Sequence, residues 1–325
     1  MVLNIIFSFN RAMQLDYLIQ SVITRFKIDY KLVVIYHTSG EHKKGYDLLK
    51  EKYAAFSHIS FSERKKVSFD WSYLDTLSSK EYRAFFFKRN FMKKNSDNFK
   101  GLVQKEIKNS NCEFVMFNTD DGVFLKDIVI PEKVFDIIRA NPENASYRMY
   151  VGENLEGFPS FVIKKEGYYE WDYYGDQEIH HWTYPFSVDG TVYHSKGLLK
   201  YLKKIAYHNP VTLEENGFQY IRKNKLFKIG LSPIYSELLL TKLNRVTTDT
   251  LNPTIHIKPE FLNEKFINGY VLELSIPEII NNCNIVPEEI ALVKGDIREV
   301  IYKMDADGKK VQSLLGIEGA KEQLR

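Results

Sequence analysis

The sequence has few cysteines, little net charge and no long apolar run. Its two cysteines, Cys112 and Cys283, form no CxxC pair, which argues against a disulfide scaffold and favours a reducing compartment. Among the 325 residues, 45 Lys and Arg stand against 42 Asp and Glu, a balance that gives no sign of a nucleic-acid partner. No apolar run reaches the roughly 18 residues of a membrane span, and the first residues show no signal-peptide pattern. We therefore expect a cytoplasmic protein that binds no nucleic acid.

A glycine-rich fingerprint is also missing from the opening strand–loop–helix unit. Residues 3–7 are β-branched and aromatic and predict a strand, and residues 15–23 carry a helical pattern. Between them lies the polar loop Ser8-Phe9-Asn10-Arg11. Such a unit opens many nucleotide-binding α/β folds, in which the helix N-terminus favours phosphate. The missing G-x-G-x-x-G pattern disfavours a dinucleotide cofactor.

The sequence does contain an alternation of strand and helix patterns. Residues 31–36 predict a second buried strand, residues 45–53 a helix, and residues 59–61 a short third strand. This alternation predicts an α/β fold with a mixed, mostly parallel sheet flanked by helices. After Pro277 the chain is charged with few aromatics, which we interpret as a C-terminal helical extension over residues 275–325. Residues 1–274 would then form the main domain.

Two adjacent carboxylates follow a later apolar run. Residues 114–117 predict a buried strand, which leads to Asp120, Asp121 and Gly122. Open α/β sheets bind ligands just beyond the carboxyl ends of their strands, and two carboxylates there suit a hard divalent cation shared with phosphate oxygens. The alternative is an ordinary turn in which Gly122 takes a positive φ.

Two segments are rich in aromatic side chains. Residues 80–108 hold nine Lys or Arg against three acids, interleaved with six aromatics. This composition suits binding to nucleobases or to an anionic membrane surface, and equally a pair of amphipathic helices with a solvated basic face. In residues 167–189, Trp and Tyr stand beside His and Asp. That mixture is typical of a sugar-binding cleft, or of an aromatic loop that packs onto itself.

The loop at residues 8–11 and the acidic stretch Asn118-Thr119-Asp120-Asp121 resemble motifs of bacterial GT-A-type nucleotide-sugar glycosyltransferases, closest to the family 2-like enzymes of capsule, O-antigen and lipopolysaccharide synthesis. The resemblance covers about residues 3–274. The family's usual Asp-x-Asp motif is replaced here by an adjacent pair, and Glu214-Glu215 stands where the family carries a Glu-Asp dipeptide. Further matching segments follow in the family's order at residues 146–154, 185–190, 209–214 and 244–246.

This resemblance implies a GT-A (Rossmann-like) fold and a defined reaction. A sugar, expected to be a hexose, would pass from a nucleotide-sugar donor to a saccharide or lipid-linked saccharide acceptor in surface polysaccharide synthesis, assisted by Mn²⁺ or Mg²⁺. A lipid-linked acceptor would suit a protein that touches the inner face of the cell membrane through residues 80–108.

The resemblance also implies roles for individual residues. The catalytic base would be Glu215, or else Glu214 or Asp189; the alternative for the two glutamates is that they satisfy the N-terminus of a helix capped by Thr212. The metal ligands would be Asp121, Asp120 and His256, with a structural role in an apolar strand as the alternative for His256. The donor nucleotide would contact Ser8, Phe9, Asn10, Arg11, His37, Thr38, Asp120, Arg148 and Arg245, and the alternative for the last two is a structural ion pair.

Two other functions fit parts of the sequence. A nucleotidyltransferase shares the sheet and the metal-binding carboxylates, but it would normally show a glycine-rich loop bearing Arg or Lys after the first strand, which residues 8–11 do not supply. A non-catalytic module could use the basic and aromatic residues 80–108 to bind nucleic acid or an anionic bilayer, and its binding would weaken steeply with salt.

Overall fold

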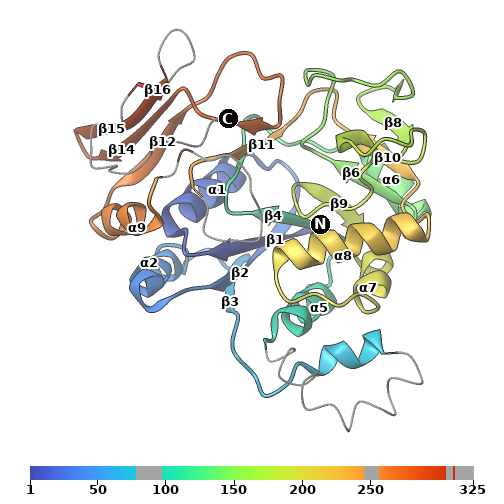
Figure 1. Ribbon diagram of the computed structural model, residues 1–325, viewed down its shortest axis with the longest axis horizontal. Coiled ribbons are helices and arrows are strands. Elements are labelled where there is room, and N and C mark those ends of the chain that lie inside the picture. Colours follow the sequence, from blue (N-terminus) through green and yellow to red (C-terminus); the bar gives the residue numbers. More distant parts are fainter. Residues whose placement is uncertain (78–96, 245–254, 256, 305–309, 312–325) are drawn as a thin grey trace, which may run out of the picture.

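The computed structural model describes residues 1–77, 97–244, 255, 257–304 and 310–311. Its centre is a nine-stranded sheet with the strand order β3-β2-β1-β4-β9-β6-β10-β8-β7 (Figure 1). Only β9 and β8 run against the other strands, which confirms the predicted mixed, mostly parallel sheet. In chain order the strands are β1 (Val2–Phe9), β2 (Tyr30–His37), β3 (Ile59–Glu63), β4 (Phe114–Thr119), β6 (Ala145–Arg148), β7 (Ile163–Lys164), β8 (Tyr169–Asp172), β9 (Thr191–His194) and β10 (Ile229–Ser232).

Helices cover both faces of this sheet. In β1, Val2 and Ile6 pack with α1, α2, α6 and α9 on one face, while Leu3, Ile5 and Phe7 pack with α5, α7 and α8 on the other. A strand buried on both sides needs apolar residues at consecutive positions, which is why β1 is a continuous apolar run. The helices are α1 (Ala12–Arg25), α2 (Lys43–Lys52), α5 (Phe99–Asn109), α6 (Glu132–Ala140), α7 (Ser195–Leu202), α8 (Pro210–Lys223) and α9 (Pro259–Ile267).

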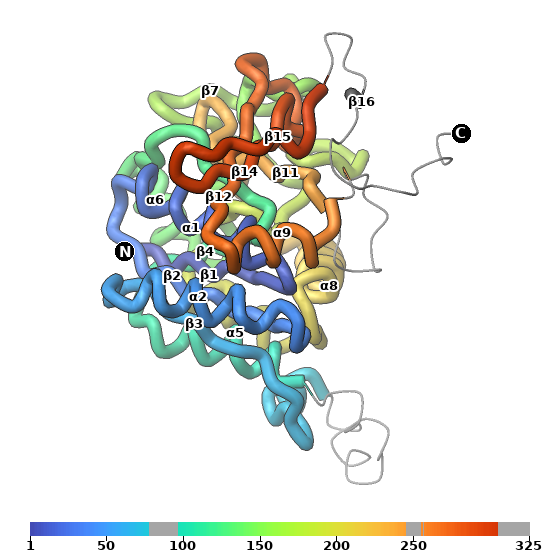
Figure 2. The backbone as a smooth tube through the Cα atoms, turned by 90° about the vertical axis from the view of Figure 1, so that its left-hand side faces the viewer, coloured from blue at the N-terminus to red at the C-terminus, as the bar shows by residue number. Residues whose placement is uncertain are grey.

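Two smaller sheets complete the described fold. One joins β5 (Gly122–Phe124), β11 (Leu238–Thr241) and β13 (Asn284–Ile285) beside the end of β4. The other has the order β12-β14-β15-β16 and lies on the side of α1 and α9 (Figure 2). Its strands are β12 (Val271–Ser275), β14 (Glu289–Lys294), β15 (Ile297–Met304) and β16 (Lys310–Val311).

The prediction of a helical C-terminal extension was wrong, because residues 289–304 form a β-hairpin. Its turn is Gly295-Asp296, with Gly295 at a φ of +55°, and such two-residue turns favour glycine. Ile290 and Leu292 of this hairpin belong to the hydrophobic core. The hairpin pairs with β12, so the small sheet takes strands from both sides of residue 275. The division into two domains at that residue stays a prediction.

The two aromatic segments differ in what the structure describes. Of residues 80–108, positions 80–96 lie outside the described part, and Phe99 and Lys100 at the start of α5 are fully buried, so neither can face a membrane. In the second segment Trp171 and Trp182 are buried against each other, and the Trp171 indole donates a hydrogen bond to the Trp182 carbonyl. This segment therefore packs onto itself. Within the described ranges, no helix is long and apolar enough to cross a membrane.

The start of α7 depends on a close approach that only glycine permits. A Cβ atom on Gly197 would lie 1.7 Å from the carbonyl oxygen of Pro142, which is a backbone atom and cannot swing away. A Cβ atom on Gly40, at the start of a short helical turn, would meet nothing within 4 Å. The two glycines therefore differ in what an added methyl group would meet.

We expect Gly197→Ala to lower the free energy of unfolding by about 2–3 kcal/mol, because the α7 start or the Pro142 loop must shift. Gly40→Ala should leave stability unchanged or raise it by up to about 1 kcal/mol, since it only restricts the unfolded chain. Urea unfolding of both variants measures the difference. Equal stabilities would contradict the close packing of α7 on this loop.

Candidate functional site

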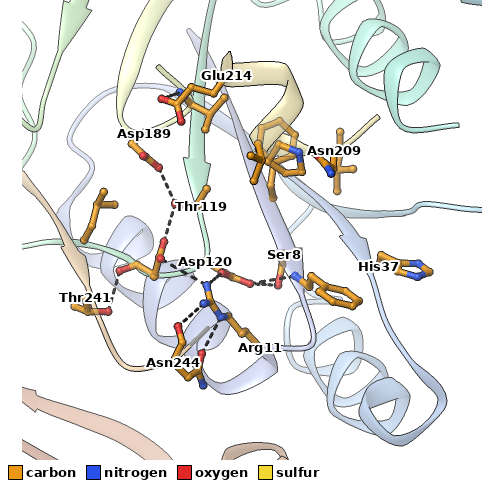
Figure 3. Close-up of a pocket in the computed structure, with 18 of the residues that line it drawn as sticks. Ser8, Arg11, His37, Thr119, Asp120, Asp189, Asn209, Glu214, Thr241 and Asn244 are labelled. Atoms are coloured by element: carbon orange, nitrogen blue, oxygen red, sulfur yellow. Dashed lines mark hydrogen bonds and ion pairs between the residues drawn. The ribbon is translucent and has the colours of Figure 1, made fainter. Parts of the chain in front are cut away.

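A pocket with a volume of about 400 Å³ opens where β1, β2 and β4 end (Figure 3). Carboxyl ends of neighbouring parallel strands are where α/β folds bind ligands. The strands contribute Ser8 and Phe9, His37, and Thr119 with Asp120 and Asp121. The opposite wall comes from the loop before β9, the start of α8, and the segment that follows β11.

The two adjacent carboxylates have different environments. Asp120 is 4% exposed, and both of its oxygens are occupied: Oδ1 accepts from the Arg11 guanidinium at 2.9 Å, and Oδ2 accepts from the Ser8 hydroxyl at 2.8 Å and the Phe9 amide at 3.2 Å. Asp121, with its side chain 32% exposed, lies 3.5 Å from the same guanidinium. Asp120 is therefore the counter-ion that holds the first loop against β4, and Asp121 is the more accessible carboxylate.

Arg11 is fixed from the other end of the chain as well. Its Nε donates to the Asn244 side-chain oxygen at 2.9 Å, and Nη2 donates to the Asn244 carbonyl at 2.6 Å. Gln14 donates to the same side-chain oxygen at 3.0 Å. The guanidinium thus joins the loop after β1, the end of β4 and the segment after β11 at one point.

A threonine hydroxyl connects Asp121 to a third acid. Thr119 Oγ1 lies 2.7 Å from an oxygen of Asp121 and 2.7 Å from an oxygen of Asp189. The hydroxyl therefore links the two carboxyl groups. Burial, followed by the charge of Glu214, raises the pKa of Asp189 well above its usual range.

Asp121 is also fixed through its backbone. Its carbonyl oxygen accepts from the Thr241 amide at 2.8 Å and from the Thr241 hydroxyl at 2.9 Å. The strand β11 therefore ends directly beside the acidic pair, although more than a hundred residues separate them in the sequence.

The helix α8 brings the fourth carboxylate, and it corrects two details of the sequence analysis. Its N-cap is Asn209, and the predicted cap Thr212 is instead the third helical residue of the capping box. Glu214 lines the pocket, and burial raises its pKa. Glu215, the first candidate for the base, is exposed and lies outside the pocket lining. Of the three predicted bases, the structure brings only Glu214 and Asp189 into the pocket.

The predicted nucleotide contacts divide in a similar way. Phe9 and His37 line the pocket and stack on each other at 5.5 Å and 10°, which gives a flat aromatic wall. Asn10, at a φ of +55°, exchanges hydrogen bonds with Ser39 instead and does not line the pocket. Thr38 does not line it either.

Arg148 is buried below the pocket, outside its lining. Its guanidinium donates to the carbonyls of His181 and Tyr184 and to the Tyr150 hydroxyl, so the structure places it as a support for the segment before β9. From this buried position Arg148 does not reach the pocket, so the structure does not support a direct contact with a donor phosphate. Arg245 and His256, the remaining candidates, lie outside the described residues.

The fit to a divalent cation is limited. Among the described residues, no three His, Cys, Asp or Glu side chains gather closely enough to hold a metal ion. Asp120 has no free oxygen for a metal, because Arg11, Ser8 and Phe9 occupy both. Asp121 does fit as a single carboxylate ligand, since Mg²⁺ is often held by one or two carboxylates together with substrate phosphate oxygens.

Several lining residues had no predicted role in the sequence. Lys242 and Asn244 follow β11, Thr241 is its last residue, Asn284 belongs to β13, and Arg64 follows β3. Only Asn244 lies in a segment that resembles the family, and only the pairing of β11 with β5 and β13 brings the residues of these two strands to the pocket. Their positions could not be read from local spacing.

No protein-family model and no curated protein sequence matches this chain. Among solved structures the chain is similar to S. aureus TarS: residues 1–349 of TarS align at 16% identity and a TM-score of 0.40, over 71% of this chain and 57% of TarS 1–349. The TarS 1–349 complexes with UDP and with UDP-GlcNAc align at 15% identity and a TM-score of 0.42, over 82% of this chain and 64% and 65% of theirs. This chain therefore spans less than two thirds of those structures. Similarity at this level supports no conclusion about function.

The unequal environments of the two aspartates predict unequal effects on stability. We expect Asp120→Asn to lower the free energy of unfolding by about 3 kcal/mol, because it leaves the largely buried Arg11 charge without its closest counter-ion. Asp121→Asn should change it by less than about 0.5 kcal/mol, since that side chain is partly exposed. Urea unfolding of the two variants is the measurement, and a larger loss for Asp121→Asn would overturn the assignment of Asp120 as the structural partner.

Proposed function

We propose that this protein is a glycosyltransferase that moves a sugar from a nucleotide-sugar donor to a saccharide or lipid-linked saccharide acceptor in surface polysaccharide synthesis. The observation that carries the proposal is the position of Asp121 in a pocket at the carboxyl ends of β1 and β4, beside the loop that opens the nucleotide-binding type of α/β unit. The aromatic wall of Phe9 and His37 suits a nucleobase, and the acids at the other end suit sugar hydroxyls.

The chemistry follows from the distribution of charge in the pocket. In a direct transfer, the acceptor oxygen forms a bond to the anomeric carbon while the bond from that carbon to the diphosphate oxygen breaks. The electron pair leaves with the diphosphate, and the acceptor proton passes to a carboxylate base. Asp189 suits this role, because it lines the pocket and Thr119 links it to Asp121 on the diphosphate side.

We include a divalent cation, Mn²⁺ or Mg²⁺, in the proposal. Asp121 would be the protein carboxylate that holds it, and the cation would neutralise charge on the leaving diphosphate. Asp120 would take no direct part in holding the ion; its role is to fix Arg11 and the loop at residues 8–11.

Binding of the donor can be tested without any knowledge of the acceptor. We expect one class among UDP-, GDP-, CMP- and dTDP-sugars to raise the melting temperature, more strongly with Mn²⁺ than with EDTA, since a ligand of the native state stabilises it. Asp121→Ala should lose the Mn²⁺-dependent part of the shift and most turnover, roughly 100-fold or more, while it keeps the fold. Absence of any response to all four classes would overturn the proposed function.

The position of the base predicts a pH profile and an order between two variants. The base must be ionised to accept a proton, and the pKa of Asp189 is raised. Activity should therefore fall as the pH decreases, and this fall should begin at a higher pH than for an ordinary aspartate. Asp189→Asn should reduce kcat about 100- to 10,000-fold with donor affinity nearly unchanged. Glu215→Gln, on the exposed side of α8, is the control and should retain activity. If Glu215→Gln is the variant that loses turnover, the sequence-based first choice is correct and Asp189 is not the base.

A further inference from the structure

The three Lys and Arg residues that line the pocket have different partners. Arg11 is paired with Asp120 and Asp121, and Arg64 is paired with Asp97 at 3.1 Å. Lys242 also lines the pocket, and within the residues that the structure describes no carboxylate lies within ion-pair distance of its ammonium group. Lys242 is therefore the lining cation whose charge is not already compensated by this part of the chain.

The backbone places Lys242 beside the acidic pair. The preceding residue, Thr241, donates two hydrogen bonds to the Asp121 carbonyl. Lys242 itself is held on both sides, because its amide donates to the Ile285 carbonyl at 3.1 Å and its carbonyl accepts from the Ile255 amide at 2.9 Å. Its backbone is thus fixed at this wall of the pocket.

The neighbours of Lys242 in the chain show which wall of the pocket it belongs to. Leu243 is buried in the core, and Asn244, the next residue, directs its side chain into the pocket to accept from Arg11. Both Lys242 and Asn244 line the pocket, whereas Leu243 between them does not. Lys242 therefore lies at the same wall of the pocket as the Asn244 partner of Arg11.

The charges that line the pocket indicate what Lys242 can bind. Four carboxyl groups line it, and the Arg11 charge is taken up by Asp120. A phosphate group that enters such a site needs a positive charge that no carboxylate already occupies. A lysine ammonium on a flexible stem can supply it as a mobile point charge.

We propose that Lys242 binds a phosphate group of the pocket's ligand. The proposal rests on the proposed function, in which that group is the diphosphate of the sugar nucleotide. The same chemistry would serve a phosphate carried by the acceptor, so the experiment must distinguish these two sources. In either case Lys242 determines whether the pocket prefers a phosphorylated ligand over the bare nucleoside or sugar.

The test compares Lys242→Met and Lys242→Arg with the wild type, by calorimetric titration of a nucleoside, its diphosphate, inorganic pyrophosphate and glycerol phosphate. The matched control is Lys133→Met, which removes the same charge from an exposed position on α6. We expect Lys242→Met to weaken binding of the nucleoside diphosphate and pyrophosphate about 10- to 100-fold, the range of a lost charge-assisted hydrogen bond. Nucleoside binding should stay unchanged, and Lys242→Arg should restore most of the phosphate affinity.

Each outcome decides between the possibilities. A loss confined to glycerol phosphate would support Lys242 as a phosphate ligand and assign that phosphate to the acceptor. Unchanged affinity for all phosphate compounds, or an equal loss in Lys133→Met, would overturn the proposal. A wild type that binds pyrophosphate through Lys242 but no nucleotide would overturn the proposed function alone. A wild type that binds none of the phosphate compounds would overturn both.

Discussion

The buried ion pair between Arg11 and Asp120 is the interaction on which the pocket depends. Two charges removed from water must be compensated almost completely by neighbours, or the folded state becomes costly. Here Ser8 and Phe9 at the end of β1, and Asn244 after β11, supply that compensation from two separate parts of the chain. Because the same contacts fix the loop after β1, the carboxyl end of β4 and the segment after β11, the need to satisfy one ion pair also determines the shape of the pocket.

Asp120 is paired with Arg11, so the other three carboxyl groups that line the pocket are the ones available to a ligand. Asp121 lines the pocket, the Thr119 hydroxyl links it to Asp189, and Glu214 approaches from α8. Raised pKa values from burial beside other charges are a feature of functional sites, although structural ion pairs can produce them too. The two aspartates are adjacent in the sequence but differ in their environments: Asp120 is held in a buried ion pair, whereas Asp121 is partly exposed.

The features of the fold and site that the sequence could predict are local ones. Largely apolar runs identified β1, β2 and β4, and the acidic pair after β4 identified the edge of the sheet where the pocket lies. The C-terminal hairpin was missed because the charged residues after Pro277 were interpreted as a helical extension, although residues 290–293 are an apolar run that ends just before the Gly295-Asp296 turn. On α8, Glu214 and Glu215 differ by one residue, about 100° around the helix, and only the packing of Leu213 and Ile221 on the core determines which one faces the pocket. Asn244 and Lys242 depend on long-range strand pairing, which local spacing does not contain.

The dependence of Arg11 on Asn244 also has a consequence for the order in which the site forms during synthesis. The loop after β1 leaves the ribosome at the start of translation, whereas the amide and carbonyl that hold its guanidinium arrive 233 residues later. A nascent chain can build β1 and β4 well before that point, but its Arg11 then lacks both hydrogen bonds to Asn244. Completion of the pocket is therefore a late event in the synthesis of this protein, because a chain that ends before residue 244 lacks part of one pocket wall.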